Sequence, residues 1–378
     1  MLNVLQISFY LDPQGRAPEQ LLTDWVSLVD VADAVAGAGA RVSVIQACPT
    51  RALIRRGAVD YHFVPPSRPR RSIVQGSEFA SLLRELKPDV LHVHGLGFAD
   101  DLRELARLAP DIPVLLQDHG GALPRPWWRH RWRRSLSLAA GMAFTGTANA
   151  DRYRRAGLID ARAKLFDVPE SSSRFTPGDR GQARAECGLH GDPAVLWVGH
   201  LDRNKDPLTV LEGLGQAARE LPGLQLWCCF GAAPLLEDVR QRIRLDAHLQ
   251  DRVHLIGRVE HQRVQTLMRA ADLFVLGSHR EGSGYALIEA LACGLPPVVT
   301  DIPSFRALTD AGRIGALWQP SDPQSLCAAL IRIAGAPQGT QRADARRHFE
   351  REVSFDAVGR KLLAAYRAIR ADAGIAAD

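Results

Sequence analysis

The sequence predicts an α/β fold made of two doubly wound parallel sheets. Short apolar runs of strand length alternate with longer segments of helical periodicity from the first residue on. The alternation stops at residues 167–180, which are rich in Ser, Pro and Gly and follow neither period, and it then starts again. With 378 residues and 46% hydrophobic composition, the chain is long enough for two domains, each with its own core.

The first half reads as one doubly wound unit. We expect residues 1–170 to form an N-terminal Rossmann-like domain and residues 171–190 to form a linker. The apolar runs predict strands at 3–8, 41–47, 61–65, 90–95, 114–119 and 142–145, and helical spacing predicts helices at 19–38, 75–86, 100–108 and 129–139.

The second half repeats the pattern, so we expect a second Rossmann-like domain at residues 191–352. An amphipathic helix at 355–370 follows. We expect residues 353–378 to pack back on the N-terminal domain, and packing on the second domain is the alternative. Ligands of such sheets bind beyond the carboxyl ends of the strands, so two facing units would share a cleft lined by loops of both. The predicted strands are 194–199, 224–231, 253–257, 273–276 and 297–300, and the predicted helices are 207–220, 235–246, 262–270 and 286–293.

Composition narrows the class of protein. No apolar run approaches eighteen residues, and the first residues lack a basic segment and a cleavage site, so we expect a cytoplasmic protein. The six cysteines show no C-x-x-C spacing, which argues against disulfides and structural zinc. A net charge of +5 is compatible with a phosphate-bearing ligand but does not by itself select one.

The most informative run comes directly after the predicted strand 273–276. Gly282 and Gly284 allow the backbone unusual dihedral angles, and a helix starts just behind them. The amides of Ser283, Tyr285 and Ala286 then lie at the start of that helix, where unpaired N–H groups and the positive end of the helix dipole favour an anion. A diphosphate is the natural occupant of this turn.

Two glutamates bracket the turn. Glu289 lies about one turn inside the helix, where its carboxylate is positioned to accept the hydroxyls of a ribose whose diphosphate rests on the turn. Glu281 lies at the strand end, near the place a donor sugar would occupy. The alternative interpretation is that both are solvated or capping carboxylates.

The run from Glu281 to Glu289 resembles the E-x7-E signature of the retaining glycosyltransferases of family four, and the likeness extends through residues 290–304. The resemblance implies the GT-B architecture of two facing Rossmann-like domains with the active site in the interdomain cleft. It also implies transfer, with retention, of a sugar from a nucleotide diphosphate donor to an unidentified acceptor: a glycan, a lipid-linked molecule or a small molecule. Glu281 would contact the donor sugar, Gly282 to Ala286 the diphosphate and sugar, and Glu289 the ribose.

A second set of candidates lies in the loop after the strand 194–199. Lys205 can neutralise the β-phosphate as the glycosidic bond breaks, which is where the leaving group accumulates charge. The family usually has Arg where this chain has His200, so either His200 donates a weaker hydrogen bond or Arg203 replaces the missing guanidinium. The alternative is that Asp202 to Asp206 form a charged surface turn.

In the first domain, His119 follows the strand 114–119 and is the acceptor-side candidate, because it resembles the family's His-Gly at this strand end. The structural alternative is a histidine bonded to a loop carbonyl. His92 and His94 share a strand face, but no third ligand is near and no D-x-D pair occurs, so we expect metal-free chemistry with no cofactor beyond the nucleotide sugar. Gly15 lies in the loop after the first strand, where the family often has a glycine pair near the donor phosphate; an ordinary loop is the alternative.

A segment at 124–134 concentrates arginines and tryptophans. Trp127, Trp128 and Trp132 with their arginine neighbours would suit peripheral contact with an anionic membrane, and Trp128 and Trp132 lie four residues apart on one helical face. The alternatives are a helix that packs on the sheet with its charges outward, and stacking on single-stranded nucleic acid, which is the least favoured.

Two other classes of protein remain as alternatives. One is a nucleotide-sugar epimerase or a phosphorylase on the same architecture; a phosphorylase would need a pyridoxal-binding lysine, and Lys205 is the only lysine of the second domain. The other is a non-catalytic relative that binds nucleotide sugar or nucleic acid, which the replacement at His200 keeps open.

Overall fold

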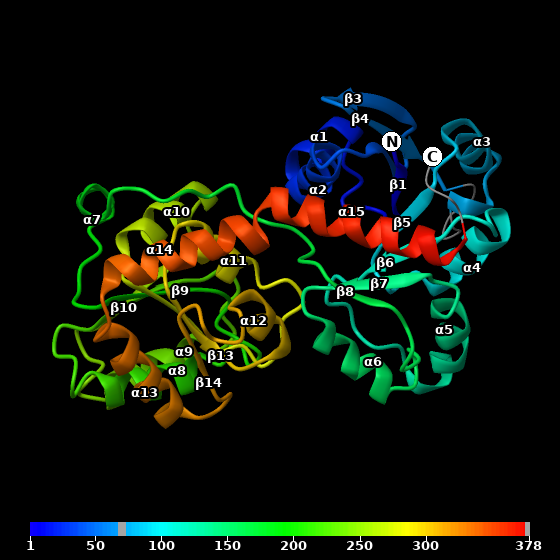
Figure 1. The fold of residues 1–378 in the computed structure, drawn as a ribbon. Helices are drawn as coiled ribbons and strands as arrows, with labels where there is room; N and C mark the ends of the chain where they lie inside the picture. The colour runs from blue at the N-terminus through cyan, green and yellow to red at the C-terminus, as the bar shows by residue number, and fades with distance from the viewer. Residues whose placement is uncertain (67–72, 375–378) are drawn as a thin grey trace. The chain divides into compact units, whose positions relative to one another are not determined.

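The computed structural model describes residues 1–66 and 73–374, which divide into two compact units (Figure 1). Unit 1 comprises residues 1–171 and the chain from Phe355 onward, and unit 2 comprises residues 172–354. Each unit contains one largely parallel sheet with helices between successive strands. The predicted α/β class with two parallel sheets is confirmed.

The sheet of unit 1 has eight strands among the described residues. They are β1 Asn3–Ser8, β2 Arg41–Ala47, β3 Ala52–Arg56, β4 Val59–Val64, β5 Val90–His94, β6 Val114–Gln117, β7 Gly141–Phe144 and β8 Leu165–Asp167. Their order in the sheet is β3-β4-β2-β1-β5-β6-β7-β8, and every neighbouring pair is parallel except β3 with β4. The order changes direction at β1, so the loops after β1 and β5 open next to each other at the carboxyl edge.

Helices cover both faces of this sheet. They are α1 Pro18–Asp24, α2 Val26–Gly37, α3 Ser77–Leu86, α4 Ala99–Leu108, α5 Arg129–Leu136, α6 Asp151–Arg155 and α15 Phe355–Asp372, with short 3₁₀ turns η1 Ile73–Gln75, η2 Pro126–Trp128 and η3 Thr147–Ala150. On one face α2 packs against α15, and both bury apolar side chains against Val4, Val44 and Val90. Side chains of α3 and α4 bury the other face against Leu5 and Leu91.

The sheet of unit 2 is entirely parallel. Its strands are β9 Ala194–Val198, β10 Gln225–Cys229, β11 Val253–Gly257, β12 Leu273–Leu276, β13 Pro297–Thr300 and β14 Ala316–Trp318, in the order β11-β10-β9-β12-β13-β14. The helices are α7 Arg180–Cys187, α8 Pro207–Ala217, α9 Leu236–Leu245, α10 His261–Ala270, α11 Tyr285–Ala292, α12 Pro303–Leu308, α13 Pro323–Ala334 and α14 Gln338–His348, followed by the π-helical turn η4 Phe349–Val353.

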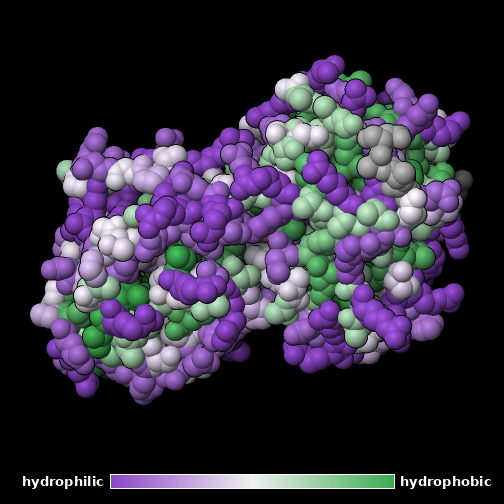
Figure 2. Space-filling view, viewed as in Figure 1, coloured by the Kyte–Doolittle hydropathy of each residue, from purple (hydrophilic) through white to green (hydrophobic). Residues whose placement is uncertain are grey.

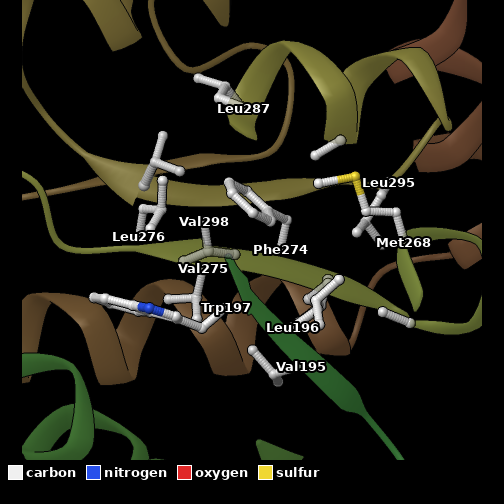
Figure 3. Close-up of a cluster of buried hydrophobic side chains, with 14 of the residues drawn as sticks. Val195, Leu196, Trp197, Met268, Phe274, Val275, Leu276, Leu287, Leu295 and Val298 are labelled. Carbon is white, nitrogen blue, oxygen red and sulfur yellow. The ribbon is translucent and has the colours of Figure 1, made fainter. Parts of the chain in front are cut away.

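The core of unit 2 forms because its central strands are continuous apolar runs that are buried on both faces. Figure 3 shows Leu287 of α11 on one side of β12 and Trp197 of β9 on the other. Helices α8 and α13 start at sequence-encoded caps: Asp206 and Asp322 each accept a backbone N–H, with a proline next in the chain. On the face shown in Figure 2, hydrophilic side chains cover much of each unit, with hydrophobic residues visible between them.

The segment 171–190, predicted as a linker, contains helix α7. Asp179 caps this helix by accepting the N–H of Gln182 at 2.7 Å, and Gly188 ends it with φ of 74°. The helix is held to unit 2 because Arg180 and Arg184 both bind the buried carboxylate of Asp272. The predicted helix at 19–38 is also interrupted, because the backbone leaves the helical conformation at Trp25 between α1 and α2.

Among the described residues, no helix combines the length and the apolar character needed to cross a bilayer.

Candidate functional site

The turn between β12 and α11 brings the predicted glycine-rich residues to the start of a helix. Gly284 is the N-cap of α11, with φ of 70°, so the N-cap residue has no side chain with which to cap the helix. A Cβ at this position would lie 2.9 Å from Cδ1 of Leu308, so both the left-handed backbone and the packing require glycine. The backbone from Gly282 to Ala286 therefore leads into an N-terminus that has the dipole to attract an anion.

Beside this turn lies a charged cluster of three side chains. The carboxylate of Glu281 accepts hydrogen bonds from the ammonium of Lys205 and, at 2.6 Å, from the hydroxyl of Ser278. The side chains of Lys205 and Glu281 are 18% and 14% exposed, so the ion pair is largely shielded from water. Lys205 follows β9 and Glu281 follows β12, and these strands are neighbours, so their carboxyl ends present both residues at the same edge.

Backbone contacts hold the two loops of this cluster together. Asn204 donates its side-chain N–H to the carbonyl of Arg280 at 3.0 Å, and its own carbonyl accepts the N–H of His279 at 2.8 Å. Gly277 permits this approach, since a Cβ there would lie 2.8 Å from the carbonyl oxygen of Lys205. Gly277 was not recognised from the sequence, although a glycine directly after a buried strand is a signal for close backbone approach.

The two residues considered for the family's arginine lie outside this ion pair. Nδ1 of His200 accepts the N–H of Ala232 at 3.0 Å, after the end of β10, so in the neutral ring the proton is on Nε2. Arg203 is exposed and makes no ion pair with any residue that the structure describes. The structure therefore joins Lys205 and Glu281 but gives His200 a backbone contact and leaves Arg203 extended to solvent.

Glu289, one turn further along α11, has a partner that sequence reasoning missed. Its carboxylate oxygen lies 2.6 Å from Nε2 of His261, at the start of α10. This hydrogen bond raises the pKa of His261 above its ordinary value. The imidazole also lies against the ring of Phe175, with the centroids 4.7 Å apart.

Unit 1 contains a separate cavity of about 500 Å³ at the carboxyl ends of β1 and β5. His119 lies in its wall, with Nε2 3.2 Å from Nδ1 of His94 and Nδ1 3.4 Å from a carboxylate oxygen of Glu170. Burial lowers the pKa of His94 well below its ordinary value, so this ring is neutral. The cavity is lined by Ser8, Tyr10, Asp12, Pro13, Gln14, Arg16, Trp25, Ser27, Leu28, Val31, Gln46, His94, Gly95, Phe98, His119 and Glu170.

His92 packs against His94 and Tyr366. Its ring packs 4.3 Å from that of His94, and its Nδ1 lies 2.7 Å from the hydroxyl of Tyr366 on α15. Within residues 1–66 and 73–374, no group of three His, Cys, Asp or Glu side chains could hold a metal ion.

The loop after β1 places Gly15 in a tight turn, where its N–H bonds the carbonyl of Asp12 at 3.1 Å. The neighbouring Arg16 binds both oxygens of the Asp12 carboxylate and also Asp24. These contacts hold the pKa of Asp12 well below its usual range. The positive charge of Arg16 is thus already neutralised by two carboxylates.

The tryptophan segment is divided between surface and core. Trp132 packs against the apolar core of unit 1, whereas Trp127 and Trp128 are 68% and 46% exposed. The guanidinium groups of Arg125 and Arg131 lie 5.5 Å from the ring centroids of Trp127 and Trp128, respectively. Trp128 and Trp132 line one surface pocket together with Arg125 and Arg131, and their expected stripe toward a membrane stays a prediction.

Comparison with known proteins assigns the chain to a family. The model described as "Glycosyltransferase Family 4" matches residues 25–163, and the model described as "Glycosyl transferases group 1" matches residues 179–348. The chain belongs to the family-four glycosyltransferases. The resemblance predicted from the E-x7-E run is confirmed.

Two relatives of this glycosyltransferase have names that describe their reactions. It is 34% identical over 307 residues to D-inositol 3-phosphate glycosyltransferase of Geodermatophilus obscurus, an alignment that covers 74% of this chain and 66% of the relative. It is 28% identical over 235 residues to GDP-mannose:cellobiosyl-diphosphopolyprenol alpha-mannosyltransferase of Xanthomonas campestris, covering 60% and 59%, respectively. The alignments thus span slightly less than two thirds of these relatives.

Solved structures share the fold of this glycosyltransferase over nearly its whole length. Sucrose-phosphate synthase of Thermosynechococcus elongatus superposes with a TM-score of 0.66 at 18% identity, covering 98% of this chain and all of the other. HepE of Anabaena, solved in complex with UDP, gives a TM-score of 0.67 at 17% identity, covering 97% and 100%. The predicted GT-B fold is confirmed.

Proposed function

We propose that this glycosyltransferase moves a sugar from a nucleotide diphosphate donor, bound by unit 2, to an acceptor bound by unit 1. The observation that carries the proposal is the shielded cluster of Lys205, Glu281 and Ser278 beside the N-terminus of α11, whose N-cap is Gly284. A diphosphate needs fixed positive charge and amide donors, and a sugar needs a hydrogen-bond acceptor for its hydroxyls. The cluster and the start of α11 together supply all three.

In the proposed reaction, the acceptor oxygen bonds to the anomeric carbon while the bond between that carbon and the phosphate oxygen breaks. The leaving β-phosphate takes the acceptor proton, and Lys205 and the amides at the start of α11 stabilise its growing charge. Glu281 orients the donor sugar, and Glu289 accepts the ribose hydroxyls. Retention of configuration is supported by family membership.

The relatives differ in donor and acceptor. One is named for inositol 3-phosphate as acceptor, the other for GDP-mannose and a cellobiosyl-diphosphopolyprenol, and HepE binds UDP. A thermal-shift panel of UDP, GDP, ADP and dTDP sugars on the purified protein tests the proposal. At a hundred times its dissociation constant, the correct donor stabilises the fold by roughly 2.7 kcal/mol. If no member of the panel raises Tm, the proposed donor site is wrong.

Glu289→Gln is expected to weaken nucleoside diphosphate binding by about 10-fold to 100-fold, because a hydrogen bond to a charged group contributes about 1.5 to 3 kcal/mol. In the free protein, protonated His261 competes for the same carboxylate. The pKa of His261 is raised, so the charged pair is complete below the ordinary histidine pKa and is lost as the pH rises through the raised value. Nucleotide affinity should therefore increase over that rise in pH, as measured by calorimetry.

His261→Asn is the matched control for this pH dependence. It removes the competing imidazole and leaves Glu289 in place, so the affinity should stay high and become nearly independent of pH. Unchanged affinity in Glu289→Gln would remove this carboxylate from the ribose site.

Excess EDTA is expected to leave the rate of sugar transfer nearly unchanged, because we propose that Lys205 and helix amides, rather than a divalent cation, meet the charge of the leaving phosphate. The measurement is the initial rate before and after chelation, with added magnesium and manganese as controls. A loss of rate that either cation restores contradicts the metal-free mechanism.

The proposal includes peripheral contact of unit 1 with an anionic membrane. Trp127 and Trp128 are exposed beside Arg125 and the arginines of α5, an arrangement that favours an interface with acidic lipid. Replacing both tryptophans with serine is expected to reduce sedimentation with phosphatidylglycerol vesicles several-fold. Binding by the native protein should weaken as salt rises, since charges are screened over about 8 Å at physiological ionic strength.

Leu245→Ser provides the control, because Leu245 is an exposed apolar side chain of unit 2, far along the chain from this segment. It should leave vesicle binding unchanged. If the native protein does not sediment with acidic vesicles, the membrane contact is wrong and the tryptophan segment has a structural role only.

A further inference from the structure

A cationic pocket of about 440 Å³ lies at the surface of unit 1, where α4 packs against α5. It shares no lining residue with the cavity around His119. Its lining consists of Arg103, Arg107, His130, Arg131, Arg134 and Leu138. Guanidinium groups that converge in this way are suited to a phosphate, whose oxygens accept several N–H groups at once.

The packing of the two helices fixes part of this lining. Arg103 and Arg107 lie four residues apart on one face of α4. Nη2 of Arg103 donates to the hydroxyl of Ser135 at 3.0 Å, and Nε of Arg131 donates to the carboxylate of Asp100 at 2.6 Å. Both bonds join α4 to α5, so these guanidinium groups are held in place before a ligand arrives, which lowers the entropy cost of binding.

The cationic pocket carries more positive than negative charge. The carboxylates of Asp100 and Glu104 pair with three of its arginines. Arg134 makes no ion pair with any residue in the described part of the chain. Four guanidinium groups and two carboxylates leave an excess of two positive charges, and residues 119–150, which include α5, contain no further Asp or Glu.

The guanidinium groups are accessible to a ligand. The side chains of Arg103, Arg131 and Arg107 are 30%, 45% and 68% exposed, respectively. Arg134 is exposed as well. The hydrogen bonds and ion pairs of the first three engage one nitrogen of each guanidinium, which has five N–H donors in all. A phosphate can therefore accept from the remaining donors without displacing Asp100 or Glu104.

Apolar side chains border the cationic pocket. Leu138 lines it and is exposed. Arg131 also lines the neighbouring surface pocket that includes Trp128, and both Trp127 and Trp128 are exposed. A phosphate in solution gains nothing from these side chains. At a bilayer surface they can enter the interfacial region while the arginines hold a headgroup.

We infer that the cationic pocket binds the phosphomonoester headgroup of a membrane lipid. Its excess of two positive charges matches a phosphomonoester, which carries about 1.5 to 2 negative charges at pH 7, better than a phosphodiester with a single charge. The guanidinium groups donate to the phosphate oxygens, and the exposed tryptophans lie in the bilayer interface. This inference rests on the proposed membrane contact of unit 1 and adds the chemistry of the lipid.

The test measures binding of the whole protein to two kinds of phosphatidylcholine vesicle. One contains phosphatidic acid, a phosphomonoester, and the other contains phosphatidylglycerol, a phosphodiester, at a mole fraction that gives the same surface charge. The native protein is expected to bind the phosphatidic acid vesicles at least about 10-fold more tightly, because charge-assisted hydrogen bonds to the phosphate add to the general attraction. Equal affinity for the two vesicles overturns the inference.

Arg134→Gln and Arg133→Gln form a matched pair of variants. Each removes one exposed charge of α5, but only Arg134 lines the cationic pocket. Arg134→Gln is expected to remove most of the preference for phosphatidic acid. Arg133→Gln should lower binding to both vesicles alike and keep the preference. An equal loss of preference in both variants would mean that the lipid senses only the overall charge of α5, and the pocket would be ruled out.

Glycerol 3-phosphate and inorganic phosphate, titrated by calorimetry, distinguish a lipid from a soluble phosphate. Each is expected to bind at least about 10-fold more weakly than accessible phosphatidic acid, because it brings no bilayer for the exposed apolar side chains to enter. If either binds as tightly as the vesicles do, the ligand is a soluble phosphate and the assignment to a lipid is wrong.

Vesicle and nucleotide titrations separate failure of the inference from failure of the proposed function. Binding to phosphatidylglycerol that replacement of Trp127 and Trp128 reduces, without a preference for phosphatidic acid, overturns the headgroup site and leaves the membrane contact standing. A native protein that binds neither vesicle overturns both. In either case, stabilisation by a nucleotide sugar would still support the donor site in unit 2.

Discussion

Lys205→Ala is expected to lower kcat by about 100-fold to 1000-fold while changing the affinity for donor only a few-fold. Only interactions that strengthen in the transition state accelerate the chemical step, and the leaving phosphate gains charge as the glycosidic bond breaks. Lys205 is suited to this role because its ammonium is largely shielded from water, next to Glu281 and the N-terminus of α11. The measurement is kcat from steady-state turnover together with the dissociation constant of the nucleoside diphosphate.

Arg203→Ala and His200→Ala are the controls for this loop. Arg203 is exposed, and His200 is bonded to the backbone of Ala232, so we expect each variant to lose less than about 10-fold in kcat. A large loss in Arg203→Ala would instead identify Arg203 as the substitute for the family's arginine. If all three variants turn over normally, this loop does not hold the leaving phosphate and the proposed mechanism is wrong.

Gly284→Ala is expected to destabilise unit 2 by about 2 to 5 kcal/mol and to abolish donor binding. The left-handed backbone costs a non-glycine residue about 1 to 2 kcal/mol, and overpacking adds about 1 to 3 kcal/mol. Here the overpacking arises from a new Cβ that would lie 2.9 Å from Leu308 and 3.3 Å from Phe305. Because Gly284 is the N-cap of α11, any shift that relieves the contact also moves the amides that would hold the diphosphate.

Gly188→Ala separates backbone strain from packing. Gly188 has φ of 74° but nothing within 4 Å of its would-be Cβ, so it should lose only the cost of the left-handed backbone, about 1 to 2 kcal/mol. It should also retain donor affinity. Unfolding in urea and calorimetry with nucleoside diphosphate measure both quantities, and equal losses in the two variants would contradict the packing argument.

The buried strands were the most predictable part of the fold. Five strands match their predicted bounds, because most of them are short, continuous apolar runs, a pattern typical of buried parallel strands. They are 3–8, 41–47, 253–257, 273–276 and 297–300. Strand β3 was missed, since it is an antiparallel edge strand with exposed arginines and no apolar run. Helix α7 was missed because eight mostly polar residues followed a segment rich in proline and glycine.

The site residues were predictable one by one, but their partners were not. Glu281 and Glu289 stand out through their spacing around two glycines, whereas the bond from Lys205 to Glu281 joins positions 76 apart in sequence. That pairing follows from the adjacency of β9 and β12, which a list of strands does not specify. The contact of His261 with Glu289 in unit 2 and that of His94 with His119 in unit 1 depend in the same way on which loops lie next to each other at the edge of the respective sheet.

The most direct test of the account is sugar transfer itself. The protein is incubated with the donors of the nucleotide-sugar panel, each with a glycan, lipid-linked or small-molecule acceptor, and the released nucleoside diphosphate and the glycosylated product are quantified by mass spectrometry. The account predicts one nucleoside diphosphate per glycosylated acceptor for at least one pair, and loss of nearly all of this turnover in Lys205→Ala. Tight binding of a nucleotide sugar with no release of nucleoside diphosphate for any pair would contradict it and leave a protein that binds the donor without transferring the sugar.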